Sequence, residues 1–311
     1  MRAARNKTIT LSPQEREDLE KDLLHTDNLT PDSLPLDTII QGNMMEVLKQ
    51  LPDHFADLII LDPPYNLTKQ FGNTEFKAAA NDKYLQYLDS WMPLVCSKLE
   101  ESGSLYLCGD WKCTAQLQQS LSQHLTILNR ITWQREKGRG AAKNWKNSME
   151  DIWFAVKNPK QYYFNAESVK LKRKVLAPYR LKGEPKDWEE TEEGKFRLTF
   201  PSNFWDDISV PFWSMVENTE HPTQKPEKLI AKLILASSRE GDIVLDPFLG
   251  SGTSAVVARK LGRHFCGIEQ EKEYCLLAQK RLRNALLDTS IQGYSDGVFW
   301  ERNTSTLQKK R

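Results

Sequence analysis

The sequence lacks several features that would assign it to a class at once. It has no apolar run near the ~20 residues that a bilayer-spanning helix needs, and its amino terminus has no apolar core typical of a secretory signal. Five cysteines with no C-x-x-C spacing argue against a disulfide framework and a zinc site, and the five histidines fall in no metal-ligand spacing. We therefore expect a cytoplasmic protein with no metal and no membrane partner.

Net charge is also nearly absent, because 43 Lys and Arg balance 42 Asp and Glu over 311 residues. The charge is nevertheless unevenly distributed. Residues 130–186 (the basic stretch) contain 15 basic and 5 acidic residues, whereas residues 187–220 (the acidic stretch) contain 2 and 9. Aromatic residues are interleaved with the basic ones, a combination that favours a nucleic-acid partner over a merely solvated surface.

Hydrophobic patterning alternates between strands and helices at both ends of the chain. Residues 56–61 form an almost continuous apolar run, as expected for a buried parallel strand. Further strands are expected at 104–108, 127–134, 151–156, 242–246 and 264–268, and helices at 83–99, 227–238, 253–261 and 272–285. This order predicts an α/β protein with a doubly wound, Rossmann-like sheet.

A glycine turn follows the strand that ends at Asp246. Gly250 and Gly252 precede a helix that begins near Thr253, a pattern that alone would fit a dinucleotide-binding fingerprint. However, Asp246 would repel a pyrophosphate and suits a cationic ligand instead. Glu269 ends the next strand, where a carboxylate can bind both hydroxyls of a ribose. A ribose joined to a cationic amino acid describes S-adenosylmethionine.

A second motif, Asp62-Pro63-Pro64-Tyr65, follows the buried strand 56–61. The prolines fix the backbone and remove two N–H donors, so the Asp62 carboxylate and the Pro63 carbonyl can converge on one amino group. Two acceptors that bind the hydrogens of an exocyclic base amine favour a pyramidal nitrogen. The lone pair of such a nitrogen can attack an electrophilic methyl group. Tyr65 supplies a face on which the base can stack.

These motifs resemble those of the β class of DNA amino-methyltransferases, in which the catalytic block precedes the cofactor block. Here the order is Asp-Pro-Pro-Tyr at 62–65, His-Pro-Thr-Gln-Lys-Pro at 221–226 and Asp-Pro-Phe-Leu-Gly-Ser-Gly-Thr at 246–253. Residues 149–155 are similar to a strand of that family, and the resemblance extends over residues 36–285. It implies a methyltransferase fold with a mixed sheet, an inserted target-recognition region, and S-adenosylmethionine as cofactor.

The resemblance also implies roles for individual residues. Thr223 and Lys225 would help to hold the methionine part of the cofactor, whereas Asn43 stands where many relatives have Asp, which leaves its contact near the adenine open. The full set of expected cofactor residues is Asn43, Thr223, Lys225, Asp246, Phe248, Gly250, Ser251, Gly252, Thr253 and Glu269.

Double-stranded DNA is the expected partner, with the target nucleotide flipped out of the helix. We expect DNA contacts from the basic stretch, at Arg135, Lys137, Arg139, Lys143, Asn144, Lys146, Lys172, Arg173 and Lys174. A cognate restriction endonuclease and a second copy of the chain remain open as further partners. The expected division is an extension with a short helix (1–35), a catalytic half (36–164), a target-recognition region (165–220), a cofactor half (221–285) and a tail (286–311).

The first residue of the catalytic block favours adenine N6 over cytosine N4 as the target, because in this family aspartate usually accompanies adenine and serine cytosine. An RNA or protein-glutamine methyltransferase is less favoured, since those resemble an Asn-Pro-Pro-Tyr form with the cofactor block first. A non-enzymatic DNA-binding regulator is disfavoured by the intact Asp62 and Tyr65. An NAD oxidoreductase interpretation lacks any hydride-transfer constellation.

Overall fold

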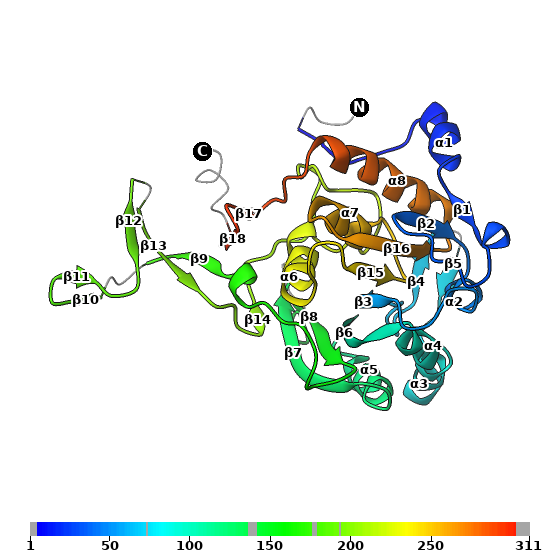
Figure 1. The fold of residues 1–311 in the computed structure, drawn as a ribbon, viewed down its shortest axis with the longest axis horizontal. Coiled ribbons are helices and arrows are strands. Elements are labelled where there is room, and N and C mark those ends of the chain that lie inside the picture. The colour runs from blue at the N-terminus through cyan, green and yellow to red at the C-terminus, as the bar shows by residue number, and fades with distance from the viewer. Residues whose placement is uncertain (1–4, 73, 136–141, 176–178, 193, 303–311) are drawn as a thin grey trace.

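The computed structural model describes residues 5–72, 74–135, 142–175, 179–192 and 194–302. Its centre is a nine-stranded sheet (Figure 1). In spatial order its strands are β1 (Leu24–His25), β2 (Thr38–Gln41), β16 (His264–Glu269), β15 (Ile243–Asp246), β3 (Ala56–Leu61), β6 (Leu99–Gly109), β8 (Met149–Val156), β7 (Thr126–Gln134) and β14 (Phe204–Trp205). Only β8 runs antiparallel to its neighbours, so the sheet is mixed, as expected.

Helices cover both faces of this sheet, which confirms the doubly wound arrangement. On β3, Leu58 and Ile60 pack into one core, whereas Ile59 and Leu61 pack into the other, because successive side chains of a strand point to opposite faces. One face carries α1 (Pro13–Glu20), α6 (Glu227–Ser237), α7 (Thr253–Lys260) and α8 (Lys272–Leu287). The other carries α2 (Met44–Leu48), α3 (Asn81–Asp89), α4 (Met92–Ser97) and α5 (Thr114–Leu121).

The single helix expected over 83–99 is wrong. The segment forms α3 and α4, with the break at Ser90 and Trp91. Pro93 lies in the first turn of α4, where its missing N–H costs nothing; inside one long helix it would have removed a hydrogen bond. Leu99 already belongs to β6.

A second, five-stranded sheet extends away from the main one (Figure 1). It consists of β12 (Glu189–Thr191), β13 (Gly194–Thr199), β9 (Leu171–Lys174), β18 (Val298–Trp300) and β17 (Tyr294–Ser295), and the hairpin β10 (Arg180–Leu181) and β11 (Glu184–Pro185) projects beyond it. The segment treated as a tail in the sequence thus supplies two strands. Within it, Phe299 and Trp300 are fully buried.

Asp207 of the acidic stretch, which follows β14 at the edge of the main sheet, binds two lysines of α6. Its carboxylate lies 2.7 Å from the Lys228 ammonium and 2.8 Å from that of Lys232, and all three side chains are buried. The Lys232 ammonium also lies over the rings of Trp205 and Phe299. The same two lysines contact the second sheet, since Lys228 donates to the Trp300 carbonyl and Lys232 lies over Phe299, so Asp207 neutralises the lysines that join β18 to α6.

The remaining small elements are the 3-10 turns at Thr26–Asn28 and Glu167–Val169 and the hairpin of β4 (Lys69–Phe71) and β5 (Thr74–Phe76). At the amino end, α1 is the short helix expected in the extension, and Ser12 and Glu15 form a capping box at its start. None of the helices in the described residues is long and apolar enough to cross a membrane. In the same residues, no three His, Cys, Asp or Glu side chains gather in a way that could hold a metal ion.

Candidate active site

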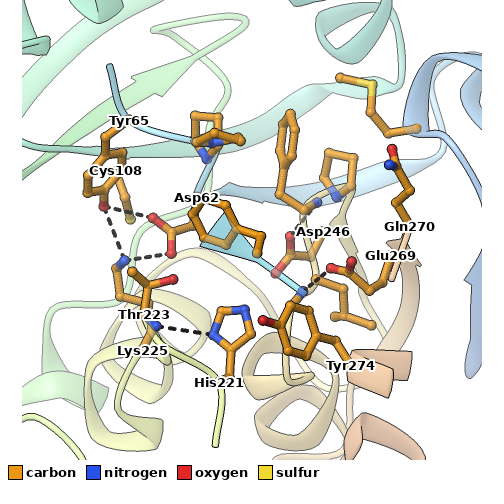
Figure 2. Close-up of a pocket in the computed structure, with 18 of the residues that line it drawn as sticks. Asp62, Tyr65, Cys108, His221, Thr223, Lys225, Asp246, Glu269, Gln270 and Tyr274 are labelled. Carbon is orange, nitrogen blue, oxygen red and sulfur yellow. Dashed lines mark hydrogen bonds and ion pairs between the residues drawn. The ribbon is translucent and has the colours of Figure 1, made fainter. Parts of the chain in front are cut away.

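The sequence motifs meet at the carboxyl ends of three neighbouring strands. Because β16, β15 and β3 are adjacent and parallel, Glu269 and Asp246, which end the first two, lie beside Asp62, which follows the third. All three line one cavity of about 540 Å³ (Figure 2). This is the edge at which parallel α/β sheets bind their ligands.

The Asp62 carboxylate is held by two donors. Its Oδ1 accepts a 2.7 Å hydrogen bond from the Tyr65 hydroxyl, and its Oδ2 accepts one of 2.5 Å from the Lys225 ammonium (Figure 2). Lys225 also lies 3.1 Å from the Tyr65 hydroxyl and is only 7% exposed. The resemblance implied that Lys225 helps to hold the methionine part of the cofactor; in the structure its ammonium contacts Asp62.

Two residues complete this group of charges. Glu150, buried on β8, has Oε2 3.4 Å from both the Lys225 ammonium and the Tyr65 hydroxyl, and it forms an ion pair with Arg135 at the end of β7. Glu150 was not singled out from the sequence, although it lies in the segment 149–155 that resembles a family strand. Arg135, for which a DNA contact is expected, lines the cavity, and that contact stays a prediction.

The Asp-Pro-Pro-Tyr turn is held from behind by α3. The buried Tyr84 hydroxyl donates a 3.0 Å hydrogen bond to the Pro64 carbonyl. Pro63 and Pro64 both line the cavity, so this bond fixes the backbone that carries the catalytic aspartate. Tyr84 is a supporting residue that no sequence motif indicated.

Residues 247–252 form the glycine turn between β15 and α7, called here the cofactor turn. Both of its glycines have positive φ, +54° at Gly250 and +83° at Gly252, a region that favours glycine. A Cβ on Gly252 would approach the Ala278 Cβ to 2.5 Å, so the turn also packs tightly against α8. The Gly250 N–H donates a 2.7 Å hydrogen bond to Oε2 of Glu269, which joins the turn to the end of β16.

Asp246 and Glu269 are acids whose burial raises their pKa. The pKa of Asp246 rises to about 7, although its carboxylate accepts hydrogen bonds from the Ser254 hydroxyl (2.5 Å) and the Phe248 N–H (3.0 Å). Glu269 accepts from two backbone N–H groups, and burial raises its pKa as well. No cation of the described part of the chain pairs with either carboxylate.

Ser251 and Thr253 support the turn through Arg281 of α8. The Arg281 guanidinium lies 2.9 Å from the Ser251 carbonyl and from the Thr253 hydroxyl. That hydroxyl in turn donates to the Lys225 carbonyl at 3.0 Å. The cofactor turn and the 221–226 block are therefore joined, which brings Lys225 to Asp62.

His221 is a further cavity residue, to which the sequence assigned no role. Its Nδ1 accepts from the Thr223 N–H at 3.3 Å, and burial lowers its pKa to about 4 (Figure 2). A neutral imidazole that accepts at Nδ1 carries its proton on Nε2. The ring packs edge-on against Tyr274, 4.4 Å between centroids, and a Cβ on Gly250 would lie 3.0 Å from Nε2. The Nε2–H thus lies beside the cofactor turn.

The far end of the cavity is apolar. Phe248 packs 5.2 Å from Trp91, centroid to centroid, and both rings line the cavity. Asn43 also lines it, but its side-chain oxygen caps α2 by accepting from the Met45 N–H. The hairpin of β4 and β5 adjoins the cavity, where the Gly72 N–H donates to the Tyr274 hydroxyl.

The other expected DNA contacts that fall within the described residues do not line the cavity. Lys137 and Arg139 fall outside the described residues; Lys143, Asn144 and Lys146 are exposed. On β9, Lys172 and Lys174 share one face, and the Lys172 ammonium lies over the rings of Phe196 and Trp300. Arg173 is on the opposite face, directly across from Arg197. The three adjacent cations of β9 therefore do not form one patch.

Comparisons with known proteins agree with this geometry. The profile of a DNA methylase family, specific for N6 and N4 amines, matches residues 56–280. The chain is 36% identical to the type II methyltransferase M.HpaI of Haemophilus parainfluenzae, over 82% of this chain and 76% of the relative. It is also 36% identical to the DNA adenine methyltransferase YhdJ of Escherichia coli, over 79% and 82% respectively.

Solved structures show the same fold. A crystal structure of M1.HpyAVI in complex with SAM is 25% identical and superimposes with a TM-score of 0.52, over 78% of this chain and 98% of the other. The cytosine-N4-specific PvuII DNA methyltransferase has a TM-score of 0.56 at 15% identity, over 81% and 92%. With its motifs gathered around one cavity and its sequence matched over most of its length, the chain belongs to the N6/N4 family of DNA methylases.

Proposed function

We propose that this DNA methylase transfers a methyl group from S-adenosylmethionine to the N6 amine of an adenine flipped out of duplex DNA. The observation that best supports this proposal is that Asp62 lines the same cavity as the cofactor turn. Adenine is favoured by the aspartate at position 62 and by the 36% identity to a relative named as an adenine methyltransferase. The likeness to the cytosine-N4 enzyme extends only to the fold.

The cavity has the chemistry that this cofactor requires. Two buried carboxylates, Asp246 and Glu269, lack a cationic partner among the described side chains, and a ligand with ammonium, sulfonium and ribose hydroxyl groups would stabilise them. The neutral His221 can donate its Nε2–H to the carboxylate of the cofactor's methionine part. When bound, S-adenosylmethionine supplies an electrophilic methyl group on sulfur.

Asp62 is the residue that prepares the amine. The lone pair of an exocyclic amine is delocalised into the ring, so a carboxylate that accepts one of its hydrogens increases the electron density on nitrogen. When the nitrogen gains the methyl group it becomes cationic, and Asp62 is placed to take the released proton. Tyr65 lies beside it, positioned to stack against the base once its hydroxyl leaves Asp62.

For the DNA contacts we propose the second sheet and residues 142–148. Arg173 and Arg197 lie opposite one another on adjacent strands. Their ion pairs, with Asp206 and Glu301 for Arg173 and with Asp187 for Arg197, are long (3.7–3.9 Å) and partly exposed, so DNA phosphates can replace them. Residues 142–147 are exposed next to the strand that carries Glu150. We assign target recognition to 165–220 together with β17 and β18. A partner nuclease and a second copy of the chain remain predictions.

The decisive experiment combines Asp62→Ala with identification of the modified base. Purified protein is incubated with methyl-labelled cofactor and unmethylated genomic DNA, and the labelled nucleoside is identified by mass spectrometry. We expect N6-methyladenine from the wild type and none from Asp62→Ala, with cofactor affinity in calorimetry nearly unchanged. N4-methylcytosine would overturn the choice of base, and transfer at the normal rate by Asp62→Ala would overturn the role of Asp62.

A further inference from the structure

Glu150 belongs to a group of four charged side chains that the Asp-Pro-Pro-Tyr block alone does not explain. Lys225 bridges two carboxylates, 2.5 Å from Asp62 and 3.4 Å from Glu150, and Arg135 pairs with Glu150 from the other side. Glu150 is 4% exposed and Lys225 is 7% exposed. Two cations and two anions therefore neutralise one another, with Glu150 and Lys225 buried and Asp62 and Arg135 partly exposed to the cavity.

This arrangement poses a problem for the substrate. Both oxygens of Asp62 are already engaged, one by the Tyr65 hydroxyl and the other by Lys225 (Figure 2). Each oxygen keeps a second lone pair that can accept from a target amine, but the positive charge of Lys225 draws electron density from the carboxylate and weakens it as an acceptor for that amine. If Lys225 moves away without a new partner, a buried ammonium is left unpaired, which is strongly unfavourable.

Glu150 offers that partner at short range. Its Oε2 faces the same ammonium, so a small movement of Lys225 exchanges one carboxylate for the other without moving any charge into solvent. Arg135 holds Glu150 in place. We infer that Glu150 is a positioning residue that receives Lys225 when the target amine binds Asp62, and this inference rests on the proposed amine methylation.

The test is Glu150→Gln, which keeps the shape of the side chain but removes its charge. We expect the single-turnover rate of methyl transfer to fall about 100-fold, because Lys225 then stays on Asp62. Cofactor affinity should stay within about twofold, since Glu150 touches no part of the cofactor turn. A matched control is Asp53→Asn, which removes the carboxylate from another buried lysine, Lys98, away from the cavity; its rate should be that of the wild type.

A double-mutant cycle shows whether Glu150 acts through Lys225. In a Lys225→Met background there is no ammonium to receive, so Glu150→Gln should lower the rate little further. A full additional 100-fold loss would overturn the inference, as would an effect of Glu150→Gln confined to cofactor binding.

A binding measurement covers the case in which Lys225→Met is inactive. Fluorescence anisotropy compares duplexes with adenine or purine, which lacks the amine, at the target position. The wild type should prefer adenine, and Glu150→Gln should lose that preference while it binds the purine duplex normally. An unchanged preference would refute the role of Glu150. A wild-type protein that methylates no DNA would instead refute the proposed function.

Discussion

The buried carboxylate of Asp246 makes cofactor affinity depend on pH in a specific way. Burial raises its pKa to about 7, and the donors that it has among the described residues, the Ser254 hydroxyl and the Phe248 N–H, are neutral. The ionised form, which suits a cationic ligand, is then about one-tenth populated at pH 6 and about nine-tenths populated at pH 8. Apparent affinity scales with the competent fraction, so Asp246 alone should improve binding about tenfold over this range.

Asp246→Asn isolates this effect, because asparagine resembles the protonated acid at every pH. Calorimetric titration with S-adenosylmethionine should find that the ratio of the wild-type affinity to the Asp246→Asn affinity is up to about tenfold larger at pH 8 than at pH 6. Titration of the ligand, and of Glu217 with its raised pKa of about 7, affects both proteins equally. His221, with a pKa of about 4, stays neutral throughout. An affinity ratio that is the same at pH 6 and pH 8 would refute this reasoning.

The same pKa predicts a change in stability without ligand. Asp246 is protonated in the folded protein up to a higher pH than in the unfolded chain, so its stabilising contribution is complete below its ordinary pKa of 3.8 and is lost as pH rises through 7. Between pH 6 and pH 8 the unfolding free energy of the wild type should therefore fall by about 1.4 kcal/mol relative to Asp246→Asn. Urea denaturation at the two pH values measures this difference, and the opposite sign would contradict the raised pKa.

Three further outcomes are expected. Glu269→Ala should weaken cofactor binding by about 1.5–3 kcal/mol if its carboxylate makes charged hydrogen bonds to the ribose; unchanged affinity in calorimetry, with the fold intact by circular dichroism, would remove that role. His221→Phe should weaken binding of S-adenosylmethionine but not of its decarboxylated analogue, and an equal loss for both would exclude an interaction with the carboxylate. Arg173→Gln with Arg197→Gln should weaken binding to all duplexes and lower the salt slope by about 0.9 for each phosphate that is no longer neutralised; the control Lys21→Gln, at the end of α1, should leave the slope unchanged.

Much of the site could be predicted because the carboxyl ends of adjacent parallel strands must lie at one edge of the sheet. Once 56–61, 242–246 and 264–268 are identified as buried strands, Asp62, Asp246 and Glu269 are expected to be neighbours. The glycine turn could be predicted for a different reason: two of its positions have positive φ, a conformation that favours glycine because it has no Cβ. The local sequence was thus sufficient to predict those parts of the site that depend on strand order or on backbone conformation.

The supporting residues could not be predicted, because they act across long distances in sequence. Tyr84 reaches the catalytic turn from α3, Arg281 reaches the cofactor turn from α8, and Glu150 reaches Lys225 from β8. Each is an ordinary residue in a helix or strand pattern. Lys225 shows the same limitation, since its motif indicates that it belongs to the site but not which carboxylate it faces.

The number of basic residues in a segment does not show how many of them are free to bind DNA. Residues of the basic stretch were expected to meet phosphates, yet Arg135 pairs with Glu150 inside the cavity and Lys172 lies over aromatic rings. The acidic stretch partly neutralises the rest, for example where Asp187 faces Arg197 at 3.8 Å. A lysine or arginine that binds a DNA phosphate releases a counterion from the DNA. It can do so only if it first leaves its partner within the protein. The salt dependence of DNA binding should therefore reflect far fewer ion pairs with phosphate than the 15 basic residues of the stretch would allow.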